Sequence, residues 1–379
     1  MVSIALIGST GSIGTQVCNV VRRYGDRFRF SALVANSSAE ALARQAAEFM
    51  PERAVLAGGG SFSGVSPVPG VCFETGERAA LDCLASCDVA FVAATGFAGL
   101  KYSLEAIRQG KRLALANKET LVCGGELVMR EAARAGIEIL PVDSEHSAIW
   151  QALHFDRHAD FERLIITASG GPFYGYTRQQ LEGVTPERAL CHPTWRMGPK
   201  ITVDSATLLN KGFEVIEAKW LYDAPYEKIE TVVQPESVIH SMVAFADGAV
   251  LAQLSYPTME VPIQLVLTYP ERLPSGLKIP DFAAMRAITF KPLRRKDFPC
   301  YDLALTAGEN GGCYPCVLNG AGEEAVHAFL RGEIPFLRIA EVIGETLSAA
   351  AYSAADSYGA LEEADGWARR KAREIISGL

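Results

Sequence analysis

The sequence predicts an α/β fold with an N-terminal Rossmann-like doubly wound parallel sheet, a central α+β domain and a C-terminal helical bundle domain. Three observations support this fold class. Apolar strand-like segments alternate with helical segments through residues 1–142. A glycine-rich turn joins the first strand to the first helix, and residues 295–379 carry long helical runs.

The strands of the N-terminal part are predicted in order along the chain. The first covers residues 4–7, and the helix after it has Val17, Val20 and Val21 on one side. A second strand covers residues 28–35. Because helices separate the strands, we expect them to run parallel. Further strands are predicted at 87–94, 111–117 and 137–143.

The remaining sequence predicts three more parts. Strand-like alternation around Asp247-Gly248 indicates a β-hairpin, which offers a sheet edge for a homodimer. A Pro-rich stretch follows and reads as a linker. We therefore predict a cofactor domain, a catalytic domain, a linker and a helical domain, with boundaries at 1–142, 143–268, 269–294 and 295–379.

Composition limits the possible functions. The chain has 379 residues and a formal net charge of −8, so no nucleic-acid partner is expected, because phosphate backbones bind basic surfaces. No apolar run of about 18 residues predicts a membrane span, and the start of the chain does not read as a signal peptide. We expect a cytoplasmic protein without a membrane partner. The nine cysteines fit reduced thiols, and Cys313 and Cys316 fit a turn beside Pro315 better than a redox or zinc site.

Gly8, Gly11 and Gly14 follow the first strand in a GxxGxxG spacing. Glycine lets the backbone approach a pyrophosphate, and the N-terminus of the next helix receives the negative charge. We predict a dinucleotide site here, with a tight serine-capped turn as the alternative. Hydroxyl donors are supplied by Ser9, Thr10 and Ser12.

The end of the second strand bears on the choice of dinucleotide. Ala35 is followed by Asn36, Ser37 and Ser38, about where an NAD-specific enzyme places an acid on the ribose. The missing acid favours NADP.

Two later strands end in polar clusters, at the sheet edge where ligands bind in open α/β sheets. The clusters are Asn117, Lys118 and Glu119, then Asp143, Ser144 and Glu145. We expect Asp143 and Glu145 to lie two apart in an extended segment, so that both carboxylates point to one side. With Glu214 as a third carboxylate, they predict an Mg²⁺ or Mn²⁺ site. A solvated acidic turn is the alternative.

The segment 192–214 is unusually rich in polar and aromatic groups. His192, Trp195 and Met197 lie between Gly and Pro residues, which predicts a lid over a ligand, with an aromatic contact to the core as the alternative. We expect Asp204 to cap a helix that carries Ser205 in its first turn. Together with the turn at Ser169, this predicts a phosphate site whose remaining donors are Asn210 and Lys211.

With these residues, the chain resembles the 1-deoxy-D-xylulose 5-phosphate reductoisomerase family over nearly its full length. The motifs are GSTGSIG, ALANKE, PVDSEHSAI, SGGPF, HPTWRMGPKITVDSATLLNKGFEVIEA, QPESVIHSMV and PCVLNGAGEEAVHAFL. The resemblance implies NADPH- and divalent-metal-dependent isomerisation and reduction of 1-deoxy-D-xylulose 5-phosphate to 2-C-methyl-D-erythritol 4-phosphate. This reaction belongs to non-mevalonate isoprenoid biosynthesis.

The resemblance also implies roles for individual residues. Catalysis would rest on Lys118, Asp143, Glu145 and Glu214, the last three as metal ligands. The phosphorylated sugar would contact Ser144, Glu145, Ser169, His192, Trp195, Met197, Ser205, Asn210, Lys211 and Glu214. NADPH would contact Gly8, Ser9, Thr10, Gly11, Ser12, Ile13, Ala35, Asn36, Asn117, Lys118, Glu119 and Gly198.

Two other functions stay open at this point. A dehydrogenase of the aspartate-semialdehyde or homoserine type would also begin with a Rossmann-like domain, and would use a nucleophilic cysteine such as Cys123 or Cys191 or a metal-free site. A dinucleotide sensor without catalysis would have no use for the carboxylates. One departure from the family pattern is Arg196, which stands in the lid where a small polar residue is usual.

Overall fold

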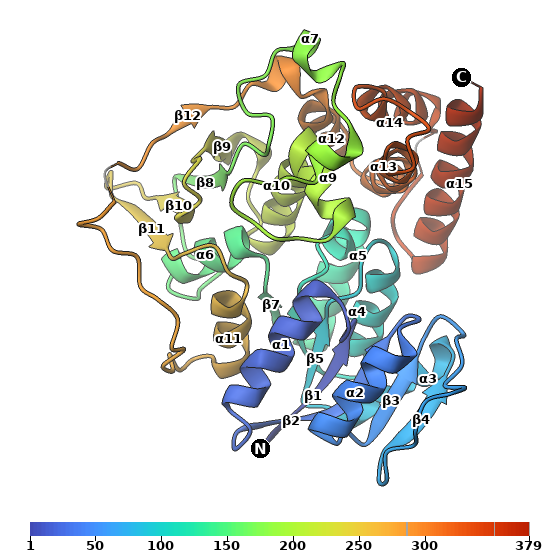
Figure 1. Ribbon diagram of the computed structural model, residues 1–379. Helices are drawn as coiled ribbons and strands as arrows, with labels where there is room; N and C mark the ends of the chain where they lie inside the picture. Colours follow the sequence, from blue (N-terminus) through green and yellow to red (C-terminus); the bar gives the residue numbers. More distant parts are fainter. Residues whose placement is uncertain (286, 352, 379) are drawn as a thin grey trace. The chain divides into compact units, whose positions relative to one another are not determined.

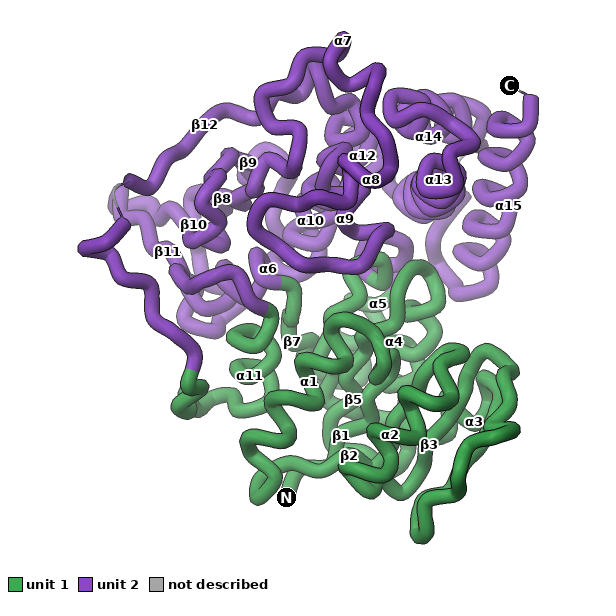
Figure 2. The backbone as a smooth tube through the Cα atoms, viewed as in Figure 1, with its two compact units in different colours: residues 1–120, 128–143, 259–276 green, residues 121–127, 144–258, 277–379 purple. Residues whose placement is uncertain are grey.

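The computed structural model describes residues 1–285, 287–351 and 353–378 (Figure 1). The chain forms two compact units, coloured green and purple in Figure 2. The first comprises residues 1–120, 128–143 and 259–276, and the second comprises residues 121–127, 144–258 and 277–379. The chain passes directly from the first unit to the second after Asp143.

The described residues of the first unit form a seven-stranded parallel sheet in the order β4-β3-β2-β1-β5-β6-β7. The predicted α/β class is confirmed. Five strands lie where the sequence predicts them, whereas β3 and β4 were not predicted. β4 lies at the sheet edge and has no buried residue, so it lacks the apolar run of an inner strand. The strands are β1 (Val2–Ile7), β2 (Phe28–Ala35), β3 (Arg53–Leu56), β4 (Cys72–Thr75), β5 (Val89–Val92), β6 (Arg112–Leu115) and β7 (Ile139–Pro141).

The strand order of this sheet reverses between β1 and β5, which is where doubly wound folds bind ligands. The glycine-rich turn follows β1 and therefore lies at this reversal. The helices of the unit are α1 (Ser12–Arg23), α2 (Ala39–Phe49), α3 (Glu77–Asp82), η1 (Cys83–Ser86), α4 (Ala98–Arg108), α5 (Glu119–Ala135), whose middle belongs to the second unit, and α11 (Glu260–Thr268).

The second unit contains a five-stranded mixed sheet in the order β11-β10-β8-β9-β12. The predicted hairpin is confirmed, since β10 pairs antiparallel with β11 across a turn in which Ala249 donates its amide to Asp247. β11 lies at one edge of this sheet. The strands are β8 (Arg163–Ala168), β9 (Ile229–Val233), β10 (Ile239–Ala244), β11 (Val250–Leu254) and β12 (Lys291–Pro292).

Helices make up the rest of the second unit. Its site-bearing helices are α6 (Ser144–Ala152), α9 (Pro199–Thr207) and α10 (Leu209–Leu221). The predicted C-terminal helical region is present, with α13 (Tyr314–Leu330) packed against both α14 (Arg338–Ala349) and α15 (Tyr358–Ser377). The remaining helices are α7 (Arg178–Leu181), α8 (Pro186–Ala189), η2 (Tyr226–Lys228), η3 (Arg295–Asp297) and α12 (Pro299–Asn310).

The four predicted domain boundaries remain a prediction. Residues 259–276, which the sequence suggests are the end of the catalytic domain and the start of the linker, group with the first unit. Arg23 of α1 pairs with Glu260 of α11 at 2.6 Å and accounts for part of this packing. Within the described residues, no helix meets the length and apolarity that a membrane span requires.

Candidate active site

The glycine-rich turn after β1 has the close packing of a dinucleotide site. A Cβ at Gly14 would lie 2.3 Å from the carbonyl oxygen of Gly8, and one at Gly8 would lie 2.4 Å from that of Ala93. Only glycine permits these approaches. Gly11 has more room, since a Cβ there would lie 3.3 Å from its nearest neighbour, and it precedes α1 without a side-chain cap. The first-turn amides of α1 are therefore available to an anion.

The residues after β2 lie at the surface. Ala35 is buried at the end of the strand, and Asn36, Ser37 and Ser38 are exposed. A Cβ at Gly58 would lie 2.5 Å from the side-chain oxygen of Asn36, so β2 and the turn after β3 meet closely here. No carboxylate stands at this strand end, in keeping with the predicted NADP preference.

Asn117 and Lys118, which follow β6, differ in what their side chains contact. Asn117 is buried and donates to the carbonyls of Ala94 and Gly96, while its oxygen accepts from the amide and hydroxyl of Thr120. These bonds hold the start of α5, and a direct NADPH contact by Asn117 stays a prediction. Lys118 is 8% exposed and its Nζ lies 2.6 Å from Oδ2 of Asp143.

The three predicted metal ligands come together. One oxygen each from Asp143, Glu145 and Glu214 lies within 4.8 Å of the others. Asp143 is attached to this group by its peptide bond to Ser144, the first residue of α6. Carboxylate oxygens are the ligands that Mg²⁺ and Mn²⁺ prefer, so the donor set fits such an ion.

The local backbone at these ligands differs from the prediction. Asp143 and Glu145 do not share an extended strand, because β7 ends at Pro141 and Ser144 begins α6. Glu145 therefore lies in the first turn of a helix. The two carboxylates still converge, since the chain turns sharply between the strand and the helix.

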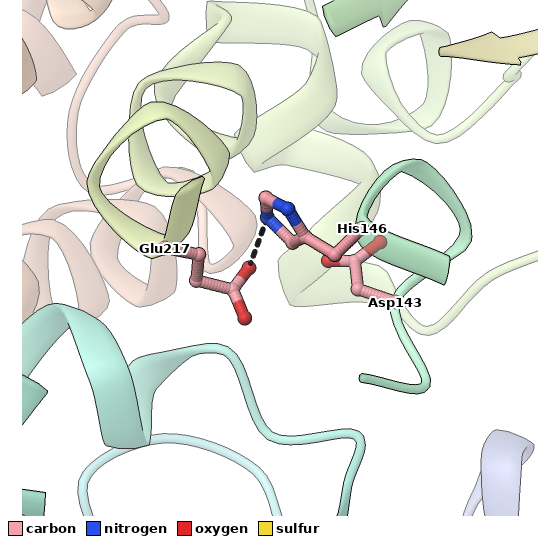
Figure 3. A group of neighbouring side chains, drawn as sticks. All are labelled: Asp143, His146 and Glu217. Atoms are coloured by element: carbon pink, nitrogen blue, oxygen red, sulfur yellow. Dashed lines mark ion pairs between the residues drawn. The ribbon is translucent and has the colours of Figure 1, made fainter. Parts of the chain in front are cut away.

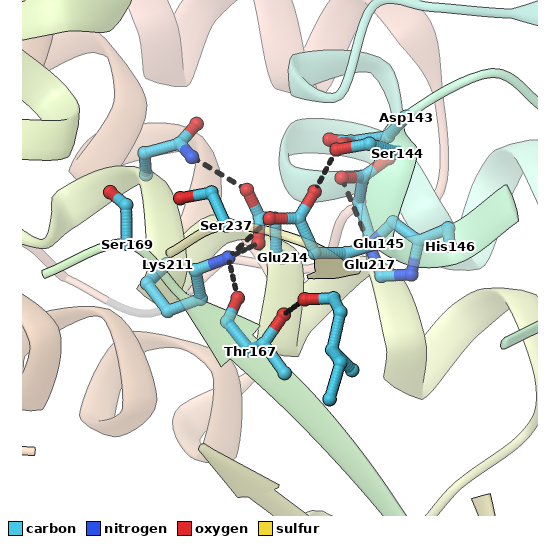
Figure 4. A network of polar contacts seen from close by, with 12 residues as sticks. Asp143, Ser144, Glu145, His146, Thr167, Ser169, Lys211, Glu214, Glu217 and Ser237 are labelled. Atoms are coloured by element: carbon cyan, nitrogen blue, oxygen red, sulfur yellow. Dashed lines mark hydrogen bonds and ion pairs between the residues drawn. The ribbon is translucent and has the colours of Figure 1, made fainter. Parts of the chain in front are cut away.

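Lys211 is the cation at the centre of the second unit's site (Figure 4). Its Nζ lies 2.8 Å from Oε1 of Glu145, pairs with Glu214 and donates to the carbonyl of Thr167 at 2.6 Å. Burial alone lowers the pKa of Lys211, but the two carboxylates outweigh it and the pKa is raised. Asn210 donates to the other oxygen of Glu214 at 2.5 Å.

The helix that was predicted to begin at Asp204 begins earlier. α9 starts at Pro199 after Gly198, so Asp204 and Ser205 lie in its last part, and Asp204 pairs with Lys200 at 2.7 Å. Leu208, with φ of 62°, breaks the helix before α10. The prediction of a cap at Asp204 was wrong, because a proline at the first helical position is the stronger start signal.

The predicted phosphate residues nevertheless come from neighbouring segments. Gly170 and Gly171 form a turn with positive φ, and a Cβ at Gly171 would lie 3.0 Å from the carbonyl oxygen of Ser205. The turn therefore packs on the end of α9. Ser169, in this turn, contacts Nε2 of His192 at 3.1 Å, while Asn210 and Lys211 lie in the first turn of α10.

The predicted lid, residues 192–198, is half-buried over the sheet. Trp195 packs edge-to-face on His240, with ring centroids 5.9 Å apart, and Thr194 contacts the hydroxyl of Ser237 at 3.1 Å. Nδ1 of His192 accepts from the amide of Trp195 at 3.0 Å. Met197 is half-buried and Arg196 points to solvent, so the departure from the family pattern lies on the surface.

Several residues of the site were missed by the sequence reading. His146 and Glu217 form a buried pair behind the carboxylates, and His240 and Ser237 receive the lid. The spacing of Glu214 and Glu217 places both on one face of a helix, and could have marked Glu217 as a neighbour of the site, but not its pairing with His146. His240 and Ser237 gave no comparable signal, because their role depends on strand pairing.

Comparison with known proteins identifies the family. The family described as 1-deoxy-D-xylulose 5-phosphate reductoisomerase matches residues 4–125, and its C-terminal domain families match 139–222 and 254–371. The reductoisomerase of Pelotomaculum thermopropionicum is 45% identical over 100% of both chains, and that of Geobacillus kaustophilus is 47% identical over 99% of each.

The chain belongs to the 1-deoxy-D-xylulose 5-phosphate reductoisomerase family. The solved reductoisomerase of Zymomonas mobilis in complex with NADPH has a TM-score of 0.92 and 39% identity, and covers 100% of this chain and 99% of its own. Another solved reductoisomerase, in complex with NADPH, fosmidomycin and magnesium, has a TM-score of 0.90 and 33% identity, with 100% and 98% covered.

These findings confirm the predicted family, fold class and enzyme class: the chain is an oxidoreductase of the reductoisomerase family. The predicted cofactors, NADPH and a divalent metal such as Mg²⁺, are those bound in the solved reductoisomerases. The individual site residues remain predictions that rest on the geometry described above.

Proposed function

We propose that the chain converts 1-deoxy-D-xylulose 5-phosphate into 2-C-methyl-D-erythritol 4-phosphate with NADPH and Mg²⁺ or Mn²⁺, through the residues described here. The observation that carries the proposal is the convergence of Asp143, Glu145 and Glu214 beside Lys211. Three carboxylates and one buried ammonium group suit a metal ion next to an anionic substrate. A dinucleotide sensor would need neither.

Different residues of the second unit would bind the two ends of the substrate. A divalent ion held by the three carboxylates would act as a Lewis acid on adjacent substrate oxygens. Ser144 lies beside Glu145 and would contact the same end. The phosphate would be held by Ser169, Ser205, Asn210 and Lys211, and binding so far from the reacting carbons would orient them.

The lid and the first unit would complete the reaction. Trp195, Met197 and His192 would cover the bound substrate and exclude water during the rearrangement. NADPH would bind along the turn 8–13 and deliver hydride to the aldehyde formed by the rearrangement. Lys118, whose Nζ lies 2.6 Å from Oδ2 of Asp143, would stabilise negative charge on a substrate oxygen next to the carboxylates.

The deciding experiment is NADPH oxidation with 1-deoxy-D-xylulose 5-phosphate, with and without EDTA. We expect substrate-dependent oxidation that EDTA abolishes and that added Mg²⁺ or Mn²⁺ restores. No metal-dependent consumption would contradict the proposal.

The environment of Cys123 argues against a mechanism that uses this residue as a nucleophile. Cys123 is buried, and burial is the main cause that raises its pKa well above the usual range, whereas a nucleophile needs a lowered pKa. Cys191 is exposed. Cys191→Ser should keep full turnover, and loss of turnover in that variant would instead support the semialdehyde dehydrogenase type.

We propose that the protein is a homodimer joined through β11. This strand is a sheet edge, and Val250 and Leu251 on it are 51% and 39% exposed. An exposed apolar edge strand is a template for pairing with a second copy. Leu251→Lys should yield monomers by light scattering, whereas Ile279→Lys, a control at an apolar residue 82% exposed, should not. The nine free cysteines support the proposed cytoplasmic location.

A further inference from the structure

Figure 3 shows a buried pair, His146 and Glu217, together with Asp143. Nε2 of His146 lies 3.2 Å from Oε2 of Glu217, and the two side chains are 0% and 3% exposed. An ionised carboxylate carries no proton, so the proton of this ion-pair contact belongs to Nε2 of His146. The reaction proposed above assigns no step to either residue.

The pair connects the two helices that carry metal ligands of the second unit. His146 follows Glu145 in the first turn of α6, and Glu217 lies one helical turn after Glu214 on the same face of α10. Glu145 and Glu214 are therefore joined across the two helices through Lys211, which we call the outer link. His146 and Glu217 join the same two helices one layer deeper, which we call the deeper link.

The deeper link has a second attachment. The phenol of Tyr222, at the end of α10, donates to the backbone carbonyl of His146. Tyr222 is 4% exposed and its ring lies 6.2 Å from the His146 ring, centroid to centroid. The first turn of α6 is thus held to α10 by both a side chain and its backbone.

The two links respond differently to ligands. The outer link uses the same carboxylates that would hold the ion, so a bound ion would compete with Lys211 for them. His146 and Glu217 are closed to solvent and need not change partners. The deeper link can therefore hold the spacing of Glu145 and Glu214 whether or not an ion occupies the carboxylate site.

We propose that Glu217 is a positioning residue for the metal site: through His146 it fixes the first turn of α6, and with it Glu145, relative to Glu214. This inference rests on the proposed function only in taking Glu145 and Glu214 as metal ligands. Groups in the layer behind metal ligands typically change metal affinity or activity by about ten- to a hundredfold when they are removed.

A second metal site at the same place is the competing explanation. Asp143, His146 and Glu217 each place one ligand atom within 4.8 Å of the others. Nε2 of His146, however, already lies 3.2 Å from Oε2 of Glu217, so an ion would have to separate these two side chains inside a closed site. The inference therefore requires one bound metal ion per chain.

The test is Mn²⁺ binding to the full-length protein without substrate or NADPH, followed by the electron paramagnetic resonance of the free ion. Wild type should bind one Mn²⁺, and Glu217→Leu should bind it at least tenfold more weakly. Glu217→Gln keeps a hydrogen-bond acceptor for His146 and should recover most of the affinity. Tyr222→Phe keeps the packing, and should weaken binding by a smaller factor.

A matched control separates positioning from general loss of stability. Glu323, on α13, is a buried carboxylate that bonds to Asn319 and Arg369. Glu323→Leu should lower the stability and leave Mn²⁺ affinity unchanged. If Glu217→Leu does not fold, Tyr222→Phe and Glu217→Gln decide the question.

Three results would overturn the inference. They are wild-type Mn²⁺ affinity in folded Glu217→Leu or, where that variant does not fold, in Tyr222→Phe; two Mn²⁺ ions per wild-type chain; and equal loss of affinity in Glu217→Gln and Glu217→Leu. Because binding is measured without turnover, failure of the proposed reaction would appear separately, as wild-type protein that binds Mn²⁺ but does not oxidise NADPH with the substrate.

Discussion

Nζ of Lys211 lies 2.8 Å from Oε1 of Glu145, a residue 66 positions earlier in the sequence. The same ammonium group pairs with Glu214, so one lysine contacts two of the three proposed metal ligands and offsets part of their negative charge. Lys211 is 5% exposed and Glu214 is 1% exposed. The lysine therefore lowers the cost of burying the two carboxylates side by side.

Lys211→Met should destabilise the metal-free protein by about 3–5 kcal/mol, because it leaves buried carboxylates without their cation. A saturating divalent ion should then raise Tm more in this variant than in wild type. Thermal unfolding with EDTA and with Mn²⁺ measures both effects. Lys219→Met, on the same helix but in an exposed pair with Asp223, is the control and should change stability by no more than about 1 kcal/mol. An equal metal-induced rise in the Tm of Lys211→Met and of wild type would show that Lys211 does not offset the charge of the carboxylates.

Glu214→Gln should keep NADPH affinity and lose turnover, because the variant removes a metal ligand while the glycine-rich turn after β1 is untouched. NADPH fluorescence titration and steady-state oxidation measure the two properties. Mn²⁺ affinity should fall together with turnover. Normal activity in this variant would show that Glu214 is not a metal ligand.

Trp195→Ala should raise KM or lower kcat at least about tenfold with little change in Tm. The Trp195 ring contacts His240 on β10 from a half-buried loop, so its loss should affect the covering of substrate more than the core. Steady-state kinetics and thermal unfolding separate the two. A large fall in Tm would instead support the alternative of an aromatic contact that stabilises the core.

Local sequence pattern predicted the sheet of the first unit well, since buried parallel strands are apolar runs that alternate with helices. It missed β3 and β4, and β4 lies at the sheet edge without a buried residue, so it lacks the apolar run of an inner strand. The hairpin of β10 and β11 was predicted because Asp247-Gly248 has one favoured turn geometry.

The site was predicted less completely, because its geometry depends on contacts between distant segments. Asp143, Glu145 and Glu214 were predicted as metal ligands from their residue type and from the motifs that contain them. The prediction that Asp143 and Glu145 share an extended segment was wrong. The pairing of Lys211 with Glu145 and of His146 with Glu217 could not be read from spacing, since each joins α6 to α10 across more than sixty residues.

Acid should destabilise the protein partly through His192. Burial lowers the pKa of its imidazole from the usual 6.5 to about 4, so the folded protein binds fewer protons than the unfolded chain between these values. Stability should therefore fall as pH drops from 6.5 towards 4 and level off for this group below 4. His192→Asn should flatten the dependence of Tm on pH in this window. A slope identical to wild type would show that His192 is not the titrating group.

Gly212→Ala should destabilise the protein by at least about 1 kcal/mol, although alanine is the better helix former by about that amount. A Cβ at Gly212 would lie 2.3 Å from the Cβ of Ala304, so α10 and α12 could not keep their close packing. Gly344→Ala, on α14, is the matched control: its nearest neighbour is the side chain of Leu303 at 3.7 Å, an ordinary contact. That variant should be stabilised by up to about 1 kcal/mol. Urea unfolding of both measures the difference, and a neutral or stabilising effect of Gly212→Ala would mean that the two helices can separate without cost.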